Sequence, residues 1–194
     1  MKLVSLSLAL VTVALLAGCA PQNKTTIDRR VVDGLPRVTA TETLTGESKI
    51  LAVDYHNRGV ALSGQNGETH IFTVPVWAKN FDRIRAGDTV KVRYDTNVEI
   101  IVRKSSDYTV SYEAAAVEVA PVGSMPEVVA VRKGTIATTV ANIDYEKRTV
   151  RLVDAAGKSI TIPVKPELKA FENVKVGDAV NFDYTEVARL EVVR

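Results

Sequence analysis

An all-β fold is the prediction from this sequence, and it depends on three observations. Residues 88–94 and 178–184 alternate between apolar and polar positions, and a period of two is typical of a half-buried strand. A Gly-Asp pair opens both segments, at Gly87-Asp88 and Gly177-Asp178, and glycine supplies the positive φ that a tight turn needs. The same pattern occurs twice along the chain, which predicts two copies of one small β-domain.

The duplication covers most of the chain after the first 35 residues. Residues 36–104 and 126–194 align without gaps at an offset of 90, and 18 of the 69 aligned positions are identical. Unrelated segments of average composition would share about four or five. A compensated pair of two-residue gaps would improve the middle, placing Val74-Pro75 on Ile162-Pro163. The pattern is a duplication and not a solenoid, which needs three or more copies.

The elements of the first copy follow in order. Residues 50–54 and 59–62 flank a turn and predict a hairpin, residues 68–76 predict another strand, and a short helical turn is expected over 77–81. Five to six strands in about 70 residues predict a small closed barrel in each copy, OB-like or SH3-like, because closure removes exposed edges. The alternative is that both copies contribute strands to a single pseudo-symmetric barrel or sandwich.

The two barrels are expected to follow a leader and a tether. Tyr108, Val110 and Tyr112 alternate like an edge strand, which extends the first domain to about residue 119. Residues 20–35 contain a proline, several polar residues and Asp33-Gly34, and predict a flexible connection. The predicted organisation is a signal peptide over 1–18, a modified cysteine and tether over 19–35, barrels over 36–119 and 126–194, and a linker over 120–125.

The N-terminus has the pattern of a secretory signal. Met1-Lys2 is a minimal positive region, and Leu3–Ala17 is apolar except for two serines and one threonine. This run is too short to span a bilayer as a mature helix, but it fits the apolar region of a signal peptide. It ends in Leu16-Ala17-Gly18-Cys19, which resembles the lipobox of bacterial lipoproteins: a branched apolar residue, two small residues and a cysteine.

That resemblance implies a covalent modification and a cellular location. It implies a diacylglyceryl thioether on Cys19, cleavage after Gly18 and acylation of the new amino terminus with a fatty acid such as palmitate. Two or three acyl chains together hold a protein stably on a membrane, whereas one anchors reversibly. Ala20 follows the cysteine, where lipoproteins retained at the inner membrane typically carry Asp. The expected location is therefore the periplasmic face of the outer membrane of a Gram-negative cell.

Composition and motifs argue against several classes of function. The formal net charge is +2 with both signs interspersed, and aromatic residues make up 6%, so neither a basic stripe nor a stacking platform for nucleic acid is evident. The chain has one cysteine and two histidines, too few for a closed four-ligand zinc site. Nucleophile elbows, phosphate loops and metalloprotease motifs are absent from the sequence. We therefore expect no enzyme activity and no cofactor.

Two kinds of polar residue remain as candidates for a site. Asp54 and Arg58, like Asp144 and Arg148, flank a hairpin turn in both copies, and we interpret them as turn residues whose carboxylates accept backbone amides. His56, His70 and Trp77 have no identical partner in the second copy, and divergence after duplication can mark a ligand site.

A histidine near a tryptophan is similar to the small periplasmic copper chaperones, which use histidine, tryptophan and two methionines. The methionines here are Met1 and Met125, so the thioethers that would select Cu(I) are missing. The leading hypothesis is a non-catalytic binding or scaffolding module of the cell envelope with a protein partner. The alternative is a periplasmic binder of a metal, glycan or peptide that uses His56, His70 and Trp77.

Overall fold

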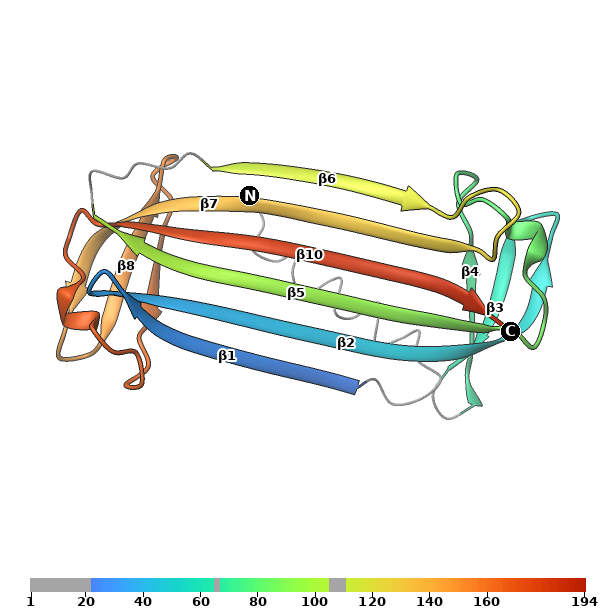
Figure 1. Cartoon of the computed structure of the whole chain (residues 1–194), viewed down its shortest axis with the longest axis horizontal. Helices are drawn as coiled ribbons and strands as arrows, with labels where there is room; N and C mark the ends of the chain where they lie inside the picture. Colours follow the sequence, from blue (N-terminus) through green and yellow to red (C-terminus); the bar gives the residue numbers. More distant parts are fainter. Residues whose placement is uncertain (1–21, 65–66, 105–110) are drawn as a thin grey trace.

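The chain forms one open antiparallel β-sheet. The computed structural model describes residues 22–64, 67–104 and 111–194, and the ten strands in these ranges all belong to that sheet (Figure 1). The first repeat supplies β1 (Gln22–Val32), β2 (Leu35–Asp54), β3 (Gly59–Ser63), β4 (Thr69–Thr73), the 3-10 helix η2 (Phe81–Arg83) and β5 (Thr89–Arg103). The second repeat supplies β6 (Tyr112–Val119), β7 (Glu127–Asp144), β8 (Thr149–Asp154), β9 (Ser159–Pro163), the 3-10 helix η3 (Phe171–Asn173) and β10 (Ala179–Val193).

The two repeats have the same strand pairing throughout. The sheet runs in the order β4-β3-β2-β5-β10-β7-β8-β9, with β1 beside β2 and β6 beside β7. The β2–β3 ladder shifts register between Ile50 and Ala52, and the β7–β8 ladder does so at the equivalent pair, Val140 and Asn142. In the middle of the repeats, β9 lies 90 residues after β4, and Val164 donates to the Arg148 carbonyl as Val74 does to that of Arg58. The ungapped offset of 90 is therefore the structural one, and the gapped alignment is wrong.

A pseudo-two-fold axis relates the repeats and passes through the middle of the sheet. β5 and β10 pair along all fifteen residues of each strand. At the centre of this ladder Thr96 lies opposite Glu186, its own equivalent in the second repeat. The sheet is thus built like a symmetric dimer within one chain.

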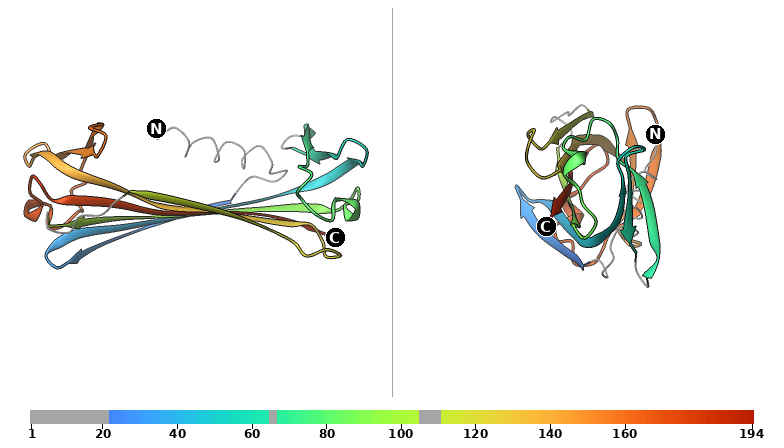
Figure 2. Two further views of the ribbon diagram at one scale, coloured as in Figure 1. Left: turned by 90° about the horizontal axis from the view of Figure 1, so that it is seen from above. Right: turned by 90° about the vertical axis from the view of Figure 1, so that its right-hand side faces the viewer.

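Both ends of the sheet curl toward the same side. The end of β2 with β3, β4 and η2 forms lobe 1, and the end of β7 with β8, β9 and η3 forms lobe 2 (Figure 2). Between them lies a central sheet of six strands in the order β1-β2-β5-β10-β7-β6. We call the side that carries the lobes the inner face and the opposite side the outer face.

Each lobe has its own hydrophobic core, and each core uses a strand of the other repeat. In lobe 1, Ile50, Leu62 and Phe81 pack with Val192 from β10, and Ala188 of the same strand packs against this cluster. In lobe 2, the equivalent cluster is joined by Ile100 and Val102 from β5. Neither repeat therefore buries its core alone.

The prediction of two tandem closed barrels is wrong, although the all-β class is confirmed. Within the described residues β4 pairs only with β3 and β9 only with β8, so the sheet is not closed. The physical reason is strand length, because β2, β5, β7 and β10 are long enough to cross from one lobe to the other. Both copies contribute strands to one pseudo-symmetric sheet, as in the alternative, but this sheet is open and is not the barrel or sandwich of that alternative.

The expected domain boundaries also change at both hairpin strands. Residues 22–32 were expected to belong to a flexible tether over 19–35, but they form β1 and pair with β2 along their whole length. The first domain was expected to extend to about residue 119, but residues 112–119 pair as β6 with β7 of the second repeat. Tyr112 lies in an edge strand as expected, whereas Tyr108 and Val110 of the same pattern lie outside the described residues. β6 is the counterpart of β1.

Candidate functional site

The inner face of the central sheet is apolar on both sides of a polar row. Residues that pair across antiparallel strands share a face, so the ladders place the even-numbered side chains of β5 and β10 on the inner face together with the lobe cores. The polar row at the pseudo-two-fold axis consists of Glu42, Thr96, Glu186 and Arg132.

Large aliphatic side chains remain exposed on this face. Five such residues lie on the inner face: Ile27 (48% exposed), Val31 (47%), Val117 (58%), Ile136 (43%) and Leu190 (38%). On the outer face Val32 and Tyr112 are exposed among charged residues. The five inner-face residues are spread over β1, β6, β7 and β10, on both sides of the polar row.

An ionic cluster occupies one side of the axis on the inner face. Arg132 donates to both carboxylate oxygens of Glu113, at 3.0 and 3.1 Å, and lies 3.7 Å from Glu186. The Tyr184 hydroxyl donates to Glu113 at 3.1 Å, and the Arg132 guanidinium lies over its ring. These bonds from Arg132 and Tyr184 lower the pKa of the Glu113 carboxyl, so Glu113 carries its negative charge at neutral pH.

The first repeat has a different arrangement at the equivalent positions. Asn23, Glu42 and Tyr94 stand where the second repeat has Glu113, Arg132 and Tyr184. The Asn23 amide donates to Glu42 at 2.8 Å. The Tyr94 hydroxyl is buried without a hydrogen-bond partner in the described residues, and burial raises the pKa of this phenol.

Tyr94 also lines a hollow on the inner face. The hollow has a volume of about 190 Å³ and lies over β5, β10, β7 and β6. Ala115, Ala130 and Ala188 supply small side chains to its lining, and Arg132 and Glu186 contribute its charged groups. Val98 is the equivalent of Ala188 in the first repeat, and its larger side chain occupies the corresponding position on the other side of the axis.

The hollow can accept one apolar group. An engineered apolar cavity of about 150 Å³ binds benzene, so a volume of about 190 Å³ is sufficient for a single aromatic or aliphatic side chain. The arrangement is chemically suited to binding.

The three residues predicted as a ligand set do not form one site. His56 lies in the β2–β3 turn, whereas His70 pairs with Leu62 toward the other end of β3, so about 10 Å of strand separates them. The His70 ring lies against Gly64, where an added Cβ would be 2.6 Å from Nε2. Trp77 is 53% exposed, and within the described residues no ring contact joins it to either histidine.

Gly18 and Cys19 lie outside the described residues. Across the described ranges no group of three His, Cys, Asp or Glu side chains is placed to hold a metal ion. No helix in the part of the chain that the structure describes is long and apolar enough to cross a membrane.

The repeated aspartate and arginine residues have structural roles. Asp54 accepts the backbone amides of His56 and Asn57, both at 3.0 Å, as expected for a turn. Arg58, expected to stack across the hairpin, donates to three backbone carbonyls of residues 74–78 and lies over the Phe81 ring. Arg148 makes the equivalent contacts in lobe 2.

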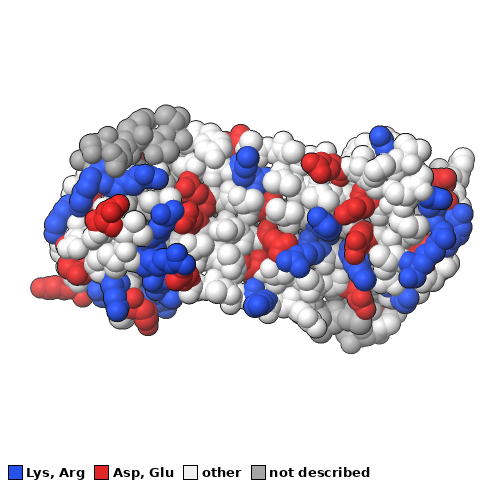
Figure 3. All heavy atoms as spheres, in the orientation of Figure 1, with Lys and Arg blue, Asp and Glu red and all other residues white. Residues whose placement is uncertain are grey.

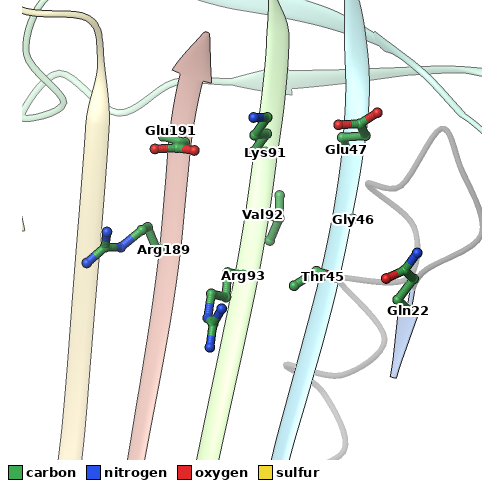
Figure 4. A pocket seen from close by; sticks show the side chains of 9 residues that line it. All are labelled: Gln22, Thr45, Gly46, Glu47, Lys91, Val92, Arg93, Arg189 and Glu191. Carbon is green, nitrogen blue, oxygen red and sulfur yellow. The ribbon is translucent and has the colours of Figure 1, made fainter. Parts of the chain in front are cut away.

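The outer face is a charged surface whose groups pair with one another. Lysine and arginine are mixed with aspartate and glutamate over it (Figure 3). A groove of about 650 Å³ lies near the start of β1, and Glu191, Lys91 and Glu47 form one alternating row across its strands (Figure 4). Arg93 in the same groove bonds Asp95 at 2.7 and 2.9 Å. Opposite charges on directly opposed residues of neighbouring strands, as at Glu191, Lys91 and Glu47, are stabilising.

Sequence reasoning missed the inner face, although part of its signal was present. The alternation of residues 88–94 continues further along the strand, because Val98, Ile100 and Val102 alternate with Asn97, Glu99 and Ile101.

Comparisons with protein-family models, curated proteins and solved structures found no match for this chain.

Proposed function

We propose that this protein is a lipid-anchored envelope protein that acts by binding, without catalysis, and that the inner face receives a protein partner. The observation that carries the proposal is the hollow beside Tyr94, because it combines small apolar walls with the charged groups of Arg132 and Glu186. The occupant we propose is one large apolar side chain of an envelope protein.

The anchor belongs to the same proposal. Acylation at Cys19, after cleavage at Gly18, would leave two residues, Ala20 and Pro21, between the modified cysteine and Gln22, the first residue of β1. The three Cα–Cα steps from Cys19 to Gln22 span at most about 11 Å. The sheet would therefore lie close to the periplasmic surface of the outer membrane instead of extending from it on a flexible tether, and it would present its inner face to partners near that membrane.

Photo-crosslinking of the lipidated chain in intact cells tests this function. A photoreactive residue in place of Val117, which lines the hollow and is 58% exposed, should give a discrete adduct with a protein other than a second copy of this chain. The same residue in place of Lys133, on the outer face of neighbouring β7, is the positional control and should not.

A variant that fills the hollow provides the matched control. Ala188→Val introduces the residue that the first repeat carries at the equivalent position, Val98, and should remove the adduct while the protein stays folded. An adduct that survives Ala188→Val, or that forms equally from position 133, would contradict the proposal.

The metal or small-ligand alternative gains no support from the geometry. Its two histidines lie at different ends of β3, and His70 is packed against glycine. Binding of an envelope protein is therefore the function that the described residues support best.

A further inference from the structure

Two long strand edges are left unpaired at the borders of the central sheet. In the described part of the chain β1 pairs only with β2, and β6 only with β7. Ten of the eleven β1 residues and seven of the eight β6 residues are exposed. An exposed edge presents free backbone N–H and C=O groups to which another strand can be added.

The two edges carry opposite charges. β1 has three cationic residues, Lys24, Arg29 and Arg30, against one aspartate. β6 has two glutamates, Glu113 and Glu118, and no cationic residue. Charged edge residues usually prevent edge-to-edge association, but edges of opposite sign attract each other.

We propose that copies of this chain assemble edge to edge, with β1 of one copy adding to β6 of the next. The six strands of the central sheet alternate in direction, so β1 and β6 run in opposite directions. A copy displaced sideways therefore presents its β6 antiparallel to β1. Because the two edges differ, the contact is heterologous and generates an open row instead of a closed dimer.

In one register of β1 against β6, each of two oppositely charged pairs lies directly opposed and on a single face of the sheet. It places Lys24 opposite Glu118 on the outer face and Arg29 opposite Glu113 on the inner face, because each pair has the same spacing along its strand. All eight residues of β6 then lie opposite residues 23–30. A shift of two residues, the smallest that keeps each side chain on its face, breaks both pairs.

Pairing between like edges is disfavoured by the same charges. Two β1 strands paired about Ile27 would place Lys24 directly opposite Arg30, and like charges in that position are destabilising. Lys24 and Glu118 take part in no ion pair among the described residues, so both are free to pair between copies. Assembly uses the free backbone groups of β1 and β6, whereas the proposed partner occupies the hollow, so the inference goes beyond the proposed binding function.

A cysteine pair in the full-length chain in cells tests the register. Thr26 and Ala116 are exposed and lie opposite each other in it, at a separation that a disulfide can bridge. Within one copy they lie on opposite edges, about 24 Å apart across five strand spacings, so a disulfide between them must join two copies. Thr26→Cys with Ala116→Cys should give a ladder of crosslinked oligomers on oxidation.

The controls separate this contact from other associations. Thr26→Cys with Ala115→Cys places the second thiol on the opposite face and should give at least fivefold less crosslinking. The wild-type chain, whose only cysteine is Cys19, measures any crosslinking through that residue. Dimers formed equally by Thr26→Cys alone would indicate like-edge pairing, and either this result or the absence of a ladder would overturn the proposal.

Charge reversal provides a second, independent measurement in the cysteine-pair chain. Lys24→Glu should reduce the crosslinked fraction at least fivefold, and adding Glu118→Lys should restore it, because the pair is then reversed and still complementary. Failure of the double variant to recover would overturn the register. Ala188→Val should leave the ladder unchanged, so a failure of edge assembly is distinguishable from a failure of inner-face binding.

Discussion

Replacing Val192 by alanine tests whether the second repeat completes the core of the first. Val192 is in β10, is 8% exposed and belongs to the lobe 1 cluster. The change removes two methyl groups, worth about 0.8 kcal/mol each, and leaves a small cavity. We therefore expect the free energy of unfolding of lobe 1 to fall by about 2 kcal/mol.

Trp77 provides the assay, because it is the only tryptophan of the chain and lies in lobe 1 between β4 and η2. Urea unfolding followed by its fluorescence should show the loss for Val192→Ala. The matched control is Val176→Ala, at a residue of the same repeat that is 64% exposed, which should change the stability by less than about 0.5 kcal/mol. If Val192→Ala behaved like this control, the shared-core interpretation would be refuted.

Three further predictions concern the axis and the outer face. A chain of residues 22–104 alone should sediment as a symmetric dimer through β5, and a folded monomer would contradict the shared sheet. Tyr94→Phe should raise the free energy of unfolding by about 1 kcal/mol, because its hydroxyl is buried without a partner; Tyr184→Phe should lower it, and chemical denaturation checks both signs. A hydrogen bond from Arg37 lowers the pKa of Glu99 from its ordinary value of 4.5, so its stabilisation is present above that pH and is lost as the pH falls through the depressed pKa. The loss of stability between pH 7 and pH 3 should therefore be smaller in Glu99→Gln than in the wild-type chain. An equal loss would show that Glu99 does not contribute to the pH dependence of stability.

The local structure of each repeat was predictable from short-range patterns. The hairpin around Tyr55 and the Gly-Asp turns occur where the sequence places them, and Asp88 accepts the Arg85 amide within its turn. These features depend on backbone geometry and on side chains a few residues apart. The same holds for Tyr112, which begins an edge strand.

The arrangement of the repeats was not predictable by the same reasoning, because it depends on partners far apart in the chain. The absence of glycine and proline from residues 89–104 and 179–194 indicates uninterrupted strands, and this signal argues against short barrel strands. Nothing local specifies that β5 pairs with β10, so the inner face, which is assembled from six strands, was not visible before the register was known. The hollow beside Tyr94 depends on that register.

The differences between the repeats point to the proposed binding surface better than any single residue type. Phe81 and Phe171 occupy equivalent places in the lobe cores, and Arg58 and Arg148 lie over their rings. At the axis the equivalents diverge, because Glu42 corresponds to Arg132 and Thr96 to Glu186. A homodimer of one repeat would have the same hollow twice or not at all. Duplication within one chain allowed an ion pair and an open hollow on one side and a filled position on the other, which is what a surface specific for a single asymmetric partner requires.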